Sequence, residues 1–475
     1  MATVTDAKSK TDNYSITDLP KLLIGADELV PTLSGLQKYI NLDNAASTPT
    51  FQPIADAVLS FLRWYSNVHR GTGFKSQLSS WVFEQSRETV TEFIGANLDN
   101  QVVIFTKNST EAINKLANRM PFARNDIILT TMMEHHSNEL PWRRAGRVEH
   151  IGLNDDGTIS KDNYLHLLSR FGKSVRLVAI TGASNVTGFI NDLDFFASKA
   201  HEAGAKILVD AAQLVPHRPV SMKSDDPVHG LDFLVFSGHK MYAPFGIGVL
   251  VGDKETFEQG DPEEVGGGVV DIVTLEEAYW TDLPEKEEAG TPDIIGVVAL
   301  AKAIKLFQAI GWDEIIRHES ELTTYALDRL KQIPNVTLYG CMDAEQASSR
   351  LGVISMNIES VPHALAAAIL NYEGAIGVRS GCFCAHTYVK CLLKVSDEDS
   401  HTMEQQILSR DRSHLPGTIR MSFGLYNTKD EIDRLTEVIG LIASGKYVGD
   451  YVLNKEKGEY HPRGFEVNMQ DYFRL

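Results

Sequence analysis

The segment FLVFSGHKMYAPFGIGVLVG, residues 233–252, places a lysine directly after an apolar run. An ammonium group is costly at the end of a buried strand, so Lys240 either extends its charge into water or has a chemical role. A desolvated lysine amine has a lowered pKa and is nucleophilic, as Schiff-base formation requires. Ser237 and His239 beside it could bind a phosphate, and the glycine-rich return lets the backbone approach a ligand closely.

A second candidate group follows the apolar run in KILVDAAQ. Asp210 ends that run, and a carboxylate at the end of a buried strand needs a partner. A cationic ring nitrogen would serve, and an aspartate paired with a pyridinium is the usual arrangement for pyridoxal phosphate. Gln213 lies three residues further on and could reach the same ligand. The alternative is that Asp210 caps a helix.

Three more apolar runs, VVIFT, DIILTT and VRLVAIT, are followed by polar residues. Ser109 and Thr110 open a helix whose N-terminus suits a phosphate, although simple capping also explains them. His135 could stack on an aromatic ligand or be structural, and Asn185 lies in a segment where a turn alone accounts for asparagine. Each of these residues is weak evidence by itself. Five strand ends that carry complementary groups are together stronger evidence for one binding site.

The order of these runs indicates the fold class. Strand-like runs alternate with helical patterns from about residue 50 to 300, which predicts an α/β fold with a mainly parallel sheet. Ligands bind beyond the carboxyl ends of such strands, where the candidate residues lie. Long amphipathic helices at 296–311 and 313–333 predict a second lobe. We expect three regions: an N-terminal arm that is part of the small domain (1–35), a large cofactor-binding domain (36–300) and a small α+β C-terminal domain (301–475).

The composition excludes several classes of function. The net charge of −18 argues against general nucleic-acid binding, because contacts to phosphates need a basic surface. No segment approaches the roughly 18 consecutive apolar residues that are needed to span a bilayer. The N-terminus is polar and lacks the apolar stretch that a secretory signal peptide contains. Four cysteines in 475 residues do not make a disulfide framework. We therefore expect a cytoplasmic protein without a membrane or nucleic-acid partner.

Ten motifs together make the chain similar to a known family. The chain resembles the class V aminotransferase family of fold-type I pyridoxal phosphate enzymes, and within it the cysteine desulfurase and selenocysteine lyase group. The resemblance covers about residues 39 to 440 and implies a large domain with a seven-stranded sheet. The motifs are YINLDNAASTPT, NVHRGTG, TKNSTEAIN, MEHHSNELPW, SNVTG, LVDAAQLVPH, FSGHKMYAPFGIGVL, EEAGTPDIIG, VRSGCFCAH and IRMSFGLYNT.

The resemblance implies a role for each candidate residue by its position. Lys240 would form the Schiff base with the cofactor and shuttle protons, and His135 would stack on the ring. Asp210 would pair with the ring nitrogen and Gln213 with the ring hydroxyl, near Asn185. The residues that would bind the phosphate are Ser109, Thr110, Ser237 and His239.

The resemblance also implies how substrate and subunits come together. In this family the threonine of a Gly-Thr-Pro sequence motif reaches the cofactor phosphate of the neighbouring subunit, and Thr291 matches that threonine. This implies a homodimer with shared sites. Arg420 would bind the substrate carboxylate, a task that suits a planar bidentate guanidinium, and Arg379 and His69 would line the same site.

Desulfurases carry a cysteine in an Arg-x-Gly-x-x-Cys loop, which Cys384 matches. A thiolate there would attack the sulfur of the substrate and leave as a persulfide, so it must lie on an accessible loop. Cys382 could assist or have no role. Cys384 could instead be a small buried hydrophobe. A metal site of Cys382, Cys384, His386 and Cys391 is a further alternative, but the spacing does not match the common paired pattern.

Several positions depart from the family pattern. Asn108, Ala211 and Asp293 stand where Gly, Gly and Asn are usual, and the segment 386–414 is long and charged. These differences leave the cofactor site intact. They leave open the identity of the substrate and of the sulfur acceptor, for which a protein is one candidate. We predict a desulfurase that converts L-cysteine to L-alanine, or acts on selenocysteine, without a metal. The alternatives are another pyridoxal phosphate-dependent C–S lyase or family enzyme, and a non-catalytic scaffold.

Overall fold

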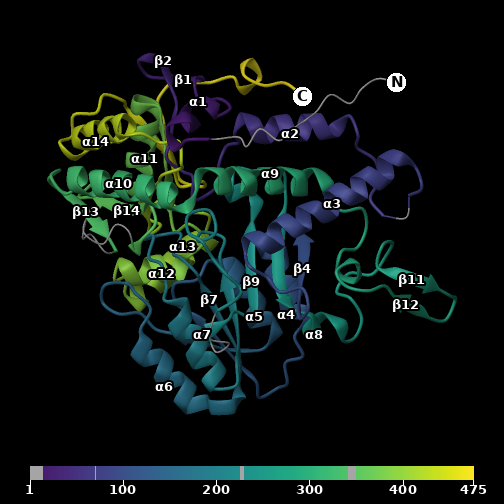
Figure 1. Ribbon diagram of the computed structural model, residues 1–475. Coiled ribbons are helices and arrows are strands. Elements are labelled where there is room, and N and C mark those ends of the chain that lie inside the picture. Colours follow the sequence, from purple (N-terminus) through teal and green to yellow (C-terminus); the bar gives the residue numbers. More distant parts are fainter. Residues whose placement is uncertain (1–13, 70, 225–228, 341–348) are drawn as a thin grey trace, which may run out of the picture.

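A seven-stranded sheet lies at the centre of the protein, whose computed structural model describes residues 14–69, 71–224, 229–340 and 349–475 (Figure 1). Within it β10 alone runs antiparallel to its neighbours, and the other adjacent pairs are parallel. The mainly parallel sheet predicted from the sequence is thus confirmed. In spatial order its strands are β4 (Gln101–Thr106), β10 (Gly248–Asp253), β9 (Phe233–Ser237), β8 (Lys206–Asp210), β7 (Val175–Thr181), β5 (Ile127–Thr131) and β6 (Arg147–Ile151).

Helices cover both faces of this sheet. Alternate residues of one strand enter different cores, because side chains point to opposite faces with a period of two. Val102 and Ile104 pack on one face, whereas Val103 and Phe105 pack on the other. The first face is covered by α4 (Ser109–Arg119), α5 (Leu140–Ala145) and α8 (Lys254–Glu258). The second is covered by α2 (Gln52–Leu62), α3 (Phe74–Phe93), α6 (Lys161–Phe171), α7 (Leu193–Glu202) and α9 (Ile294–Ile310).

The second lobe is built on an antiparallel sheet with its own core. Its strands are β13 (Val336–Tyr339), β14 (Val353–Ile358), β17 (Thr418–Ser422) and β16 (Arg379–Gly381), in this order. Its helices include α10 (Trp312–Leu330), α11 (His363–Gly374), α12 (His386–Leu392), α13 (Asp397–Leu408) and α14 (Lys429–Ala443).

Part of the N-terminal segment packs on this second lobe, whereas Ile16 and Leu19 belong to the core of the first. After α1 (Leu19–Leu22), a hairpin of β1 (Leu29–Thr32) and β2 (Gly35–Lys38) packs near α11. Then β3 (Ile40–Asn41) pairs in parallel with β15 (Ile376–Gly377). The chain thus enters the second lobe, leaves it for the first and returns. The predicted boundary at residue 300 lies inside α9, and the division into domains stays a prediction.

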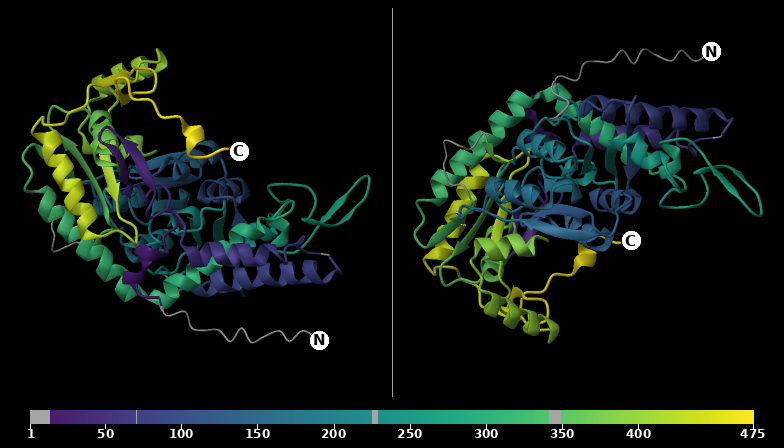
Figure 2. Two further views of the ribbon diagram at one scale, coloured as in Figure 1. Left: turned by 90° about the horizontal axis from the view of Figure 1, so that it is seen from above. Right: turned by 90° about the horizontal axis from the view of Figure 1, so that it is seen from below.

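Two hairpins lie outside the main layers. In Figures 1 and 2 the hairpin of β11 (Val270–Val273) and β12 (Ala278–Trp280) projects away from the body. The other, β18 (Tyr451–Asn454) with β19 (Glu459–Pro462), lies in the C-terminal segment. Among the described helices no single one is long and apolar enough to cross a membrane; α9 and α10 meet that test only as a pair, bent by 84°.

A buried carboxylate joins the two lobes. Glu319 of α10 is paired with His217, at 2.8 Å, and with Arg218, both of which follow β8 in the first lobe. The backbone N–H of Gly352 also donates to Glu319, at 2.8 Å. Burial opposes the ionisation of Glu319, but its interactions with His217 and Arg218 outweigh burial and lower its pKa to about 2.

Removal of this carboxylate would take away the buried negative charge beside the Arg218 guanidinium. We expect Glu319→Ala to lower the free energy of unfolding by about 3–5 kcal/mol. Glu321→Ala on the same helix removes only an exposed pair with Arg317 and should change it by less than about 0.5 kcal/mol. Denaturant titration at neutral pH measures both. Because the pKa of Glu319 is lowered, the difference should shrink as the pH falls from 4.5, its ordinary value, towards 2. Equal effects of the two substitutions would contradict the assignment.

Candidate active site

A cavity of about 550 Å³ lies where the carboxyl ends of the central strands meet the second lobe. It brings together residues that are far apart in the chain, including most of those that the sequence predicts. The predicted residues that line it are Ser109, Thr110, His135, Asn185, Asp210, Gln213, Ser237, His239, Lys240, Arg379, Cys384 and Arg420.

Lys240 and Asp210 form the charged floor of this cavity. Lys240 follows β9 in a short 3-10 turn, and Asp210 is the last residue of β8. Burial lowers the pKa of Lys240 to about 8; Asp210 opposes that shift and Arg420 adds to it. A minor fraction of the amine is therefore neutral and nucleophilic near neutral pH, far more than at the ordinary pKa of lysine. Burial also raises the pKa of Asp210, whose carboxylate accepts a hydrogen bond from the backbone of Ala212 at 3.0 Å.

Hydroxyl groups gather at the N-terminus of α4. The Ser109 N–H donates to Ser237 Oγ at 2.8 Å, and the hydroxyls of Thr110 and Ser137 lie 2.7 Å apart. Asn108 caps the helix by accepting from a backbone N–H, so the capping role falls to Asn108 rather than to Ser109. A Cβ at Gly248 would lie 2.5 Å from the Asn108 backbone, which explains why the return strand needs glycine here. Helix N–H groups with hydroxyls suit a phosphate.

Two histidines of the cavity are neutral. Burial, with Lys240 second, lowers the pKa of His135 to about 3 and that of His239 to about 4. His135 Nδ1 accepts from the Ser137 N–H at 3.1 Å, so the ring is held in one orientation. Its neighbour Glu134 accepts from Thr131, Asn138 and the Thr181 N–H, which ties this segment to the end of β7. An uncharged, oriented ring is suited to stacking on an aromatic ligand.

The loop that carries Cys384 reaches the cavity from the second lobe. Phe383 and Cys384 have φ angles of 52° and 54°, in the left-handed region that non-glycine residues rarely adopt. The Asn185 amide donates to the Phe383 carbonyl at 2.9 Å, and the His136 N–H donates to the Cys384 carbonyl at 2.7 Å. These bonds from the first lobe hold the loop tip in place.

The two neighbouring thiols differ sharply. Cys384 is exposed and lies close enough to Lys240 to affect its pKa, so the alternative of a small buried hydrophobe does not fit. Cys382 donates to the Pro416 carbonyl at 3.0 Å, and burial raises its pKa to about 11. The thiol of Cys384 is therefore the one positioned for chemistry in the cavity.

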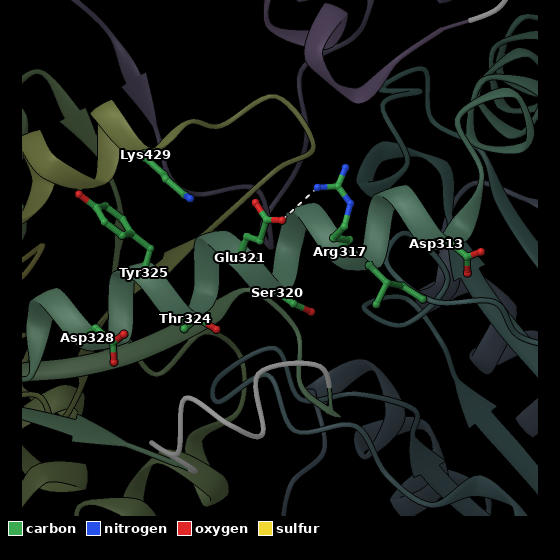
Figure 3. Close-up of a pocket in the computed structure, with 9 residues that line it drawn as sticks. Asp313, Arg317, Ser320, Glu321, Thr324, Tyr325, Asp328 and Lys429 are labelled. Carbon is green, nitrogen blue, oxygen red and sulfur yellow. Dashed lines mark hydrogen bonds and ion pairs between the residues drawn. The ribbon is translucent and has the colours of Figure 1, made fainter.

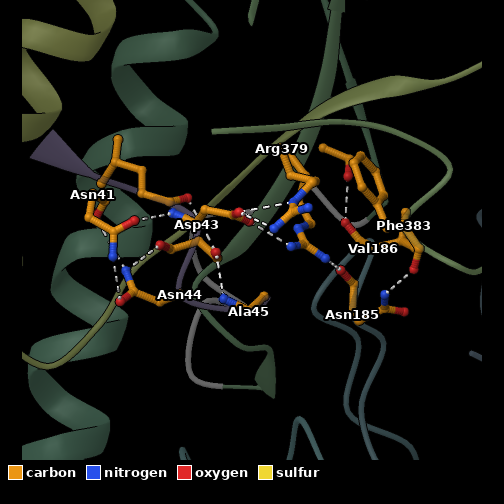
Figure 4. Close-up of polar contacts among 12 residues, drawn as sticks. Asn41, Asp43, Asn44, Ala45, Asn185, Val186, Arg379 and Phe383 are labelled. Carbon is orange, nitrogen blue, oxygen red and sulfur yellow. Dashed lines mark hydrogen bonds and ion pairs between the residues drawn. The ribbon is translucent and has the colours of Figure 1, made fainter. Parts of the chain in front are cut away.

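The predicted substrate-binding arginines already share a protein carboxylate. Arg420 and Arg379 lie opposite each other on β17 and β16. Asp43 Oδ1 accepts from Arg420 Nη2 at 2.9 Å, and Asp43 Oδ2 lies 2.8 Å from Arg379 Nη2 and 2.9 Å from its Nε (Figure 4). The Arg420 guanidinium also donates to the Asn185 carbonyl and lies 4.8 Å from the ring centroid of Phe383. Asp43 belongs to a motif noted in the sequence, but its partners lie more than 330 residues away.

Two predicted residues lie outside this cavity. His69 donates its backbone N–H to Ser80, packs edge-on against Phe83 and lies near Glu84 and Glu285. Thr291 lines an adjoining cavity of about 220 Å³. Their proposed roles remain predictions.

The other alternative for the cysteine loop is not supported by the geometry. Among the described residues, three or more metal-ligating atoms come within 4.8 Å of one another only at His69, Glu84 and Glu285. The side chains of Cys382, Cys384, His386 and Cys391 do not form such a group.

A larger hollow of about 610 Å³ lies on the exposed side of α10 (Figure 3). It is lined by surface side chains such as Tyr325 and Lys429 and by the exposed ion pair of Arg317 with Glu321. It contains none of the predicted site residues, so the strand-end cavity is the candidate active site.

The sequence model for aminotransferase class-V matches residues 40–435, and the chain belongs to this family. A probable cysteine desulfurase of Halalkalibacterium halodurans is 38% identical over 420 residues, which cover 86% of this chain and 94% of that protein. A cysteine desulfurase of Haloferax volcanii is 34% identical over 409 residues, with 84% and 88% covered. The apo structure of a cysteine desulfurase from Thermococcus onnurineus has a TM-score of 0.76 at 33% identity and covers 90% of this chain and 98% of that one.

The lowered pKa of Lys240 can be tested on cofactor-free protein. We expect its labelling by an amine-directed reagent, followed by peptide mass spectrometry, to rise with pH around a midpoint of about 8. Because the Asp210 carboxylate raises the pKa of Lys240, Asp210→Asn should move the midpoint lower. A midpoint near 10.5, the ordinary value, or no response to Asp210→Asn would contradict the proposed burial of Lys240 beside the Asp210 carboxylate.

Proposed function

We propose that the chain is a pyridoxal phosphate-dependent cysteine desulfurase, which converts L-cysteine to L-alanine and takes the sulfur as a persulfide on Cys384. The observation that carries this proposal is the meeting of an accessible thiol from one lobe with a nucleophilic amine from the other, in one cavity. The names of relatives at 34–38% identity support it.

The residues of the cavity fit the proposed cofactor. Ser109, Thr110, Ser237 and His239 would hold its phosphate at the start of α4, and His135 would stack on its ring. The buried carboxylate of Asp210 suits a cationic ring nitrogen, and Gln213 and Asn185 would contact the ring hydroxyl. Lys240 supplies the amine that attaches the cofactor to the chain. Bound pyridoxal phosphate would supply an electron sink for the charge that develops at Cα of the substrate.

Side chains of the protein would bind the substrate, transfer the protons and accept the sulfur. Arg420, with Arg379 beside it, would bind the substrate carboxylate, and Lys240 would remove the Cα proton and return a proton to Cβ. The Cys384 thiolate would attack the sulfur of the substrate. An S–S bond forms, the Cβ–S bond breaks with its electron pair on carbon, and protonation of that carbon together with the return of a proton to Cα gives alanine. The same steps would apply to selenocysteine.

The sulfur would then leave the protein from an exposed position. Cys384 lies on the surface of the second lobe, so a small thiol or an acceptor protein could reach its persulfide. A reducing, cytoplasmic setting would keep Cys384 as a thiol between turnovers.

We further infer that two copies of the chain assemble. Thr291 lies in a separate cavity, where its hydroxyl would serve a cofactor phosphate of the partner subunit. The projecting hairpin exposes the apolar side chains of Ile272, Val273 and Leu275, which a second copy would cover.

The reaction can be tested by product analysis. With L-cysteine and a reducing thiol, we expect alanine and sulfide in equal amounts. Cys384→Ala should reduce turnover at least about 100-fold, because it removes the nucleophile. Cys391→Ala is the matched control: it removes another exposed thiol and should leave turnover unchanged. Pyruvate with sulfide, or turnover that survives Cys384→Ala, would mean a β-eliminating lyase instead.

The cofactor can be tested separately from turnover. We expect the purified protein to bind pyridoxal phosphate and to show the visible absorbance of the lysine-attached cofactor. Lys240→Ala should abolish that band, because the attachment point is lost. A protein that takes up no pyridoxal phosphate would exclude the enzyme and leave the scaffold hypothesis.

A further inference from the structure

The Cys384 loop contains a tight turn with an unfavourable backbone at both central residues. The Ala385 N–H donates to the Cys382 carbonyl at 2.8 Å and so closes a turn over Phe383 and Cys384. Their φ angles of 52° and 54° are positive, as in a type I′ turn, which ordinarily takes glycine, asparagine or aspartate there. Larger side chains are strained at such positions, so the turn persists only where its surroundings hold it.

The chain is anchored on both sides of this turn, in different lobes. Before the turn, Gly381 ends strand β16 of the second lobe. After it, Ala385 and Tyr388 are fully buried in the core of the first lobe, and the Tyr388 hydroxyl donates to the Gly157 carbonyl at 2.9 Å. The turn therefore spans the two lobes, and the direction of the Cys384 side chain depends on what holds the peptide groups between the anchors.

Two residues of the first lobe hold these peptide groups. The Asn185 amide donates to the Phe383 carbonyl at 2.9 Å (Figure 4). His136 contributes twice, because its backbone N–H donates to the Cys384 carbonyl at 2.7 Å and its ring Nε2 accepts the His386 N–H at 3.3 Å. His136 thus bonds to the peptide groups on both sides of Ala385.

The two adjacent histidines have different positions. His135 and Ser137 line the strand-end cavity, whereas His136 does not. Its half-buried ring instead packs edge-on against the exposed ring of His386, with the centroids 4.6 Å apart. Acceptance at Nε2 requires a neutral ring with its proton on Nδ1. Burial lowers the pKa of His136 from the ordinary 6.5, so the ring is neutral at pH 7 and above.

We propose that the side chain of His136 is a positioning residue for Cys384: by accepting the His386 N–H, it holds the strained turn in the conformation that directs the thiol into the strand-end cavity. This inference rests on the proposed function, which assigns the attack on the substrate sulfur to Cys384. His136 acts through the backbone of the loop and takes no part in bond breaking.

Amide hydrogen exchange measures this bond directly. In the purified full-length protein, mass spectrometry with fragmentation to single residues follows the His386 N–H. We expect His136→Ala to lower the protection of that N–H about fivefold, because it loses its acceptor. His136→Gln should restore the protection, since its amide oxygen reaches about as far as Nε2, whereas His136→Asn is one methylene shorter and should not. Equal protection in the Gln and Asn variants would overturn the proposal.

Turnover shows whether the bond serves the thiol. With L-cysteine, we expect His136→Ala and His136→Asn to lower kcat at least about tenfold, because the thiol is no longer held at the substrate sulfur. KM should change less than about twofold, since the cavity that binds the substrate is intact. His136→Gln should keep most of the wild-type kcat. A loss of kcat that His136→Gln does not rescue, or a change in KM alone, would contradict a positioning role.

Two control variants separate the hydrogen bond from other effects of removing a ring. His150→Ala removes a partly buried histidine that is bonded to Glu139 at 3.2 Å and should change neither protection nor kcat. His386→Ala removes the ring packed on His136 but keeps the backbone N–H, so the protection of that N–H should change less than about twofold. If His386→Ala and His136→Ala have equal effects, ring packing rather than the hydrogen bond holds the turn, and the proposal fails.

The bond also has a pH dependence of defined sign. A protonated ring carries a hydrogen on Nε2 and cannot accept the His386 N–H. Because the pKa of His136 is lowered, wild-type protection should be full above pH 6.5 and fall as the pH drops below it, whereas His136→Gln does not titrate and should keep its protection. The same decline in both proteins would overturn the assignment. The titratable and charged groups around the ring are His135, Glu139, Arg143, Cys384 and His386, with Lys390 beside His386.

The two proposals fail in different ways. Hydrogen exchange needs no turnover, so a protein that forms no alanine can still show the difference between His136→Gln and His136→Asn. Normal formation of alanine together with unchanged protection in His136→Ala would overturn only the role of His136.

Discussion

The buried carboxylate of Glu319 holds the second lobe against the carboxyl ends of the central strands, and the candidate site depends on that contact. Lys240 and Asp210 come from the first lobe, whereas Cys384 and Arg420 come from the second. The fully buried Arg350 reinforces the contact by donating to the Thr187 and Val353 carbonyls. A rotation of one lobe by a few degrees would separate the thiol from the amine, so the ion pairs at the junction set the geometry of the site.

Burial sets the protonation states in the cavity. The removal of water lowers the pKa values of Lys240, His135 and His239 and raises that of Asp210. The result is an amine that is partly neutral, with two uncharged rings, at the same pH. The local sequence around each residue is ordinary, so the low dielectric of the cavity, rather than any one neighbour, prepares these groups for chemistry.

Sequence reasoning found the parts of the site that have a local signature. Lys240, Asp210, His135 and Ser109 each follow an apolar strand, and parallel strands bring such ends together. The pairing of Asp43 with Arg420 has no local signature, because 377 residues separate the two and any exposed carboxylate looks the same in a sequence. The Glu319 junction is hidden for the same reason: a glutamate in an amphipathic helix is ordinarily read as part of its solvated face.

The positions of His69 and Thr291 show a different limit. Neither lines the cavity that holds the other predicted residues, and the family resemblance assigns Thr291 to the neighbouring subunit.

The path of the chain through the second lobe has a consequence for synthesis. Strand β3 and Asp43 are made early, yet their partners β15, Arg379 and Arg420 are made more than 330 residues later. During synthesis, the first lobe can therefore fold before the N-terminal strands have the partner strands with which they pair. The corner formed by Asp43, Arg379 and Arg420 is consequently among the last parts of the molecule to form, and a chain that stops short of residue 376 would expose the edge of β3 to other chains.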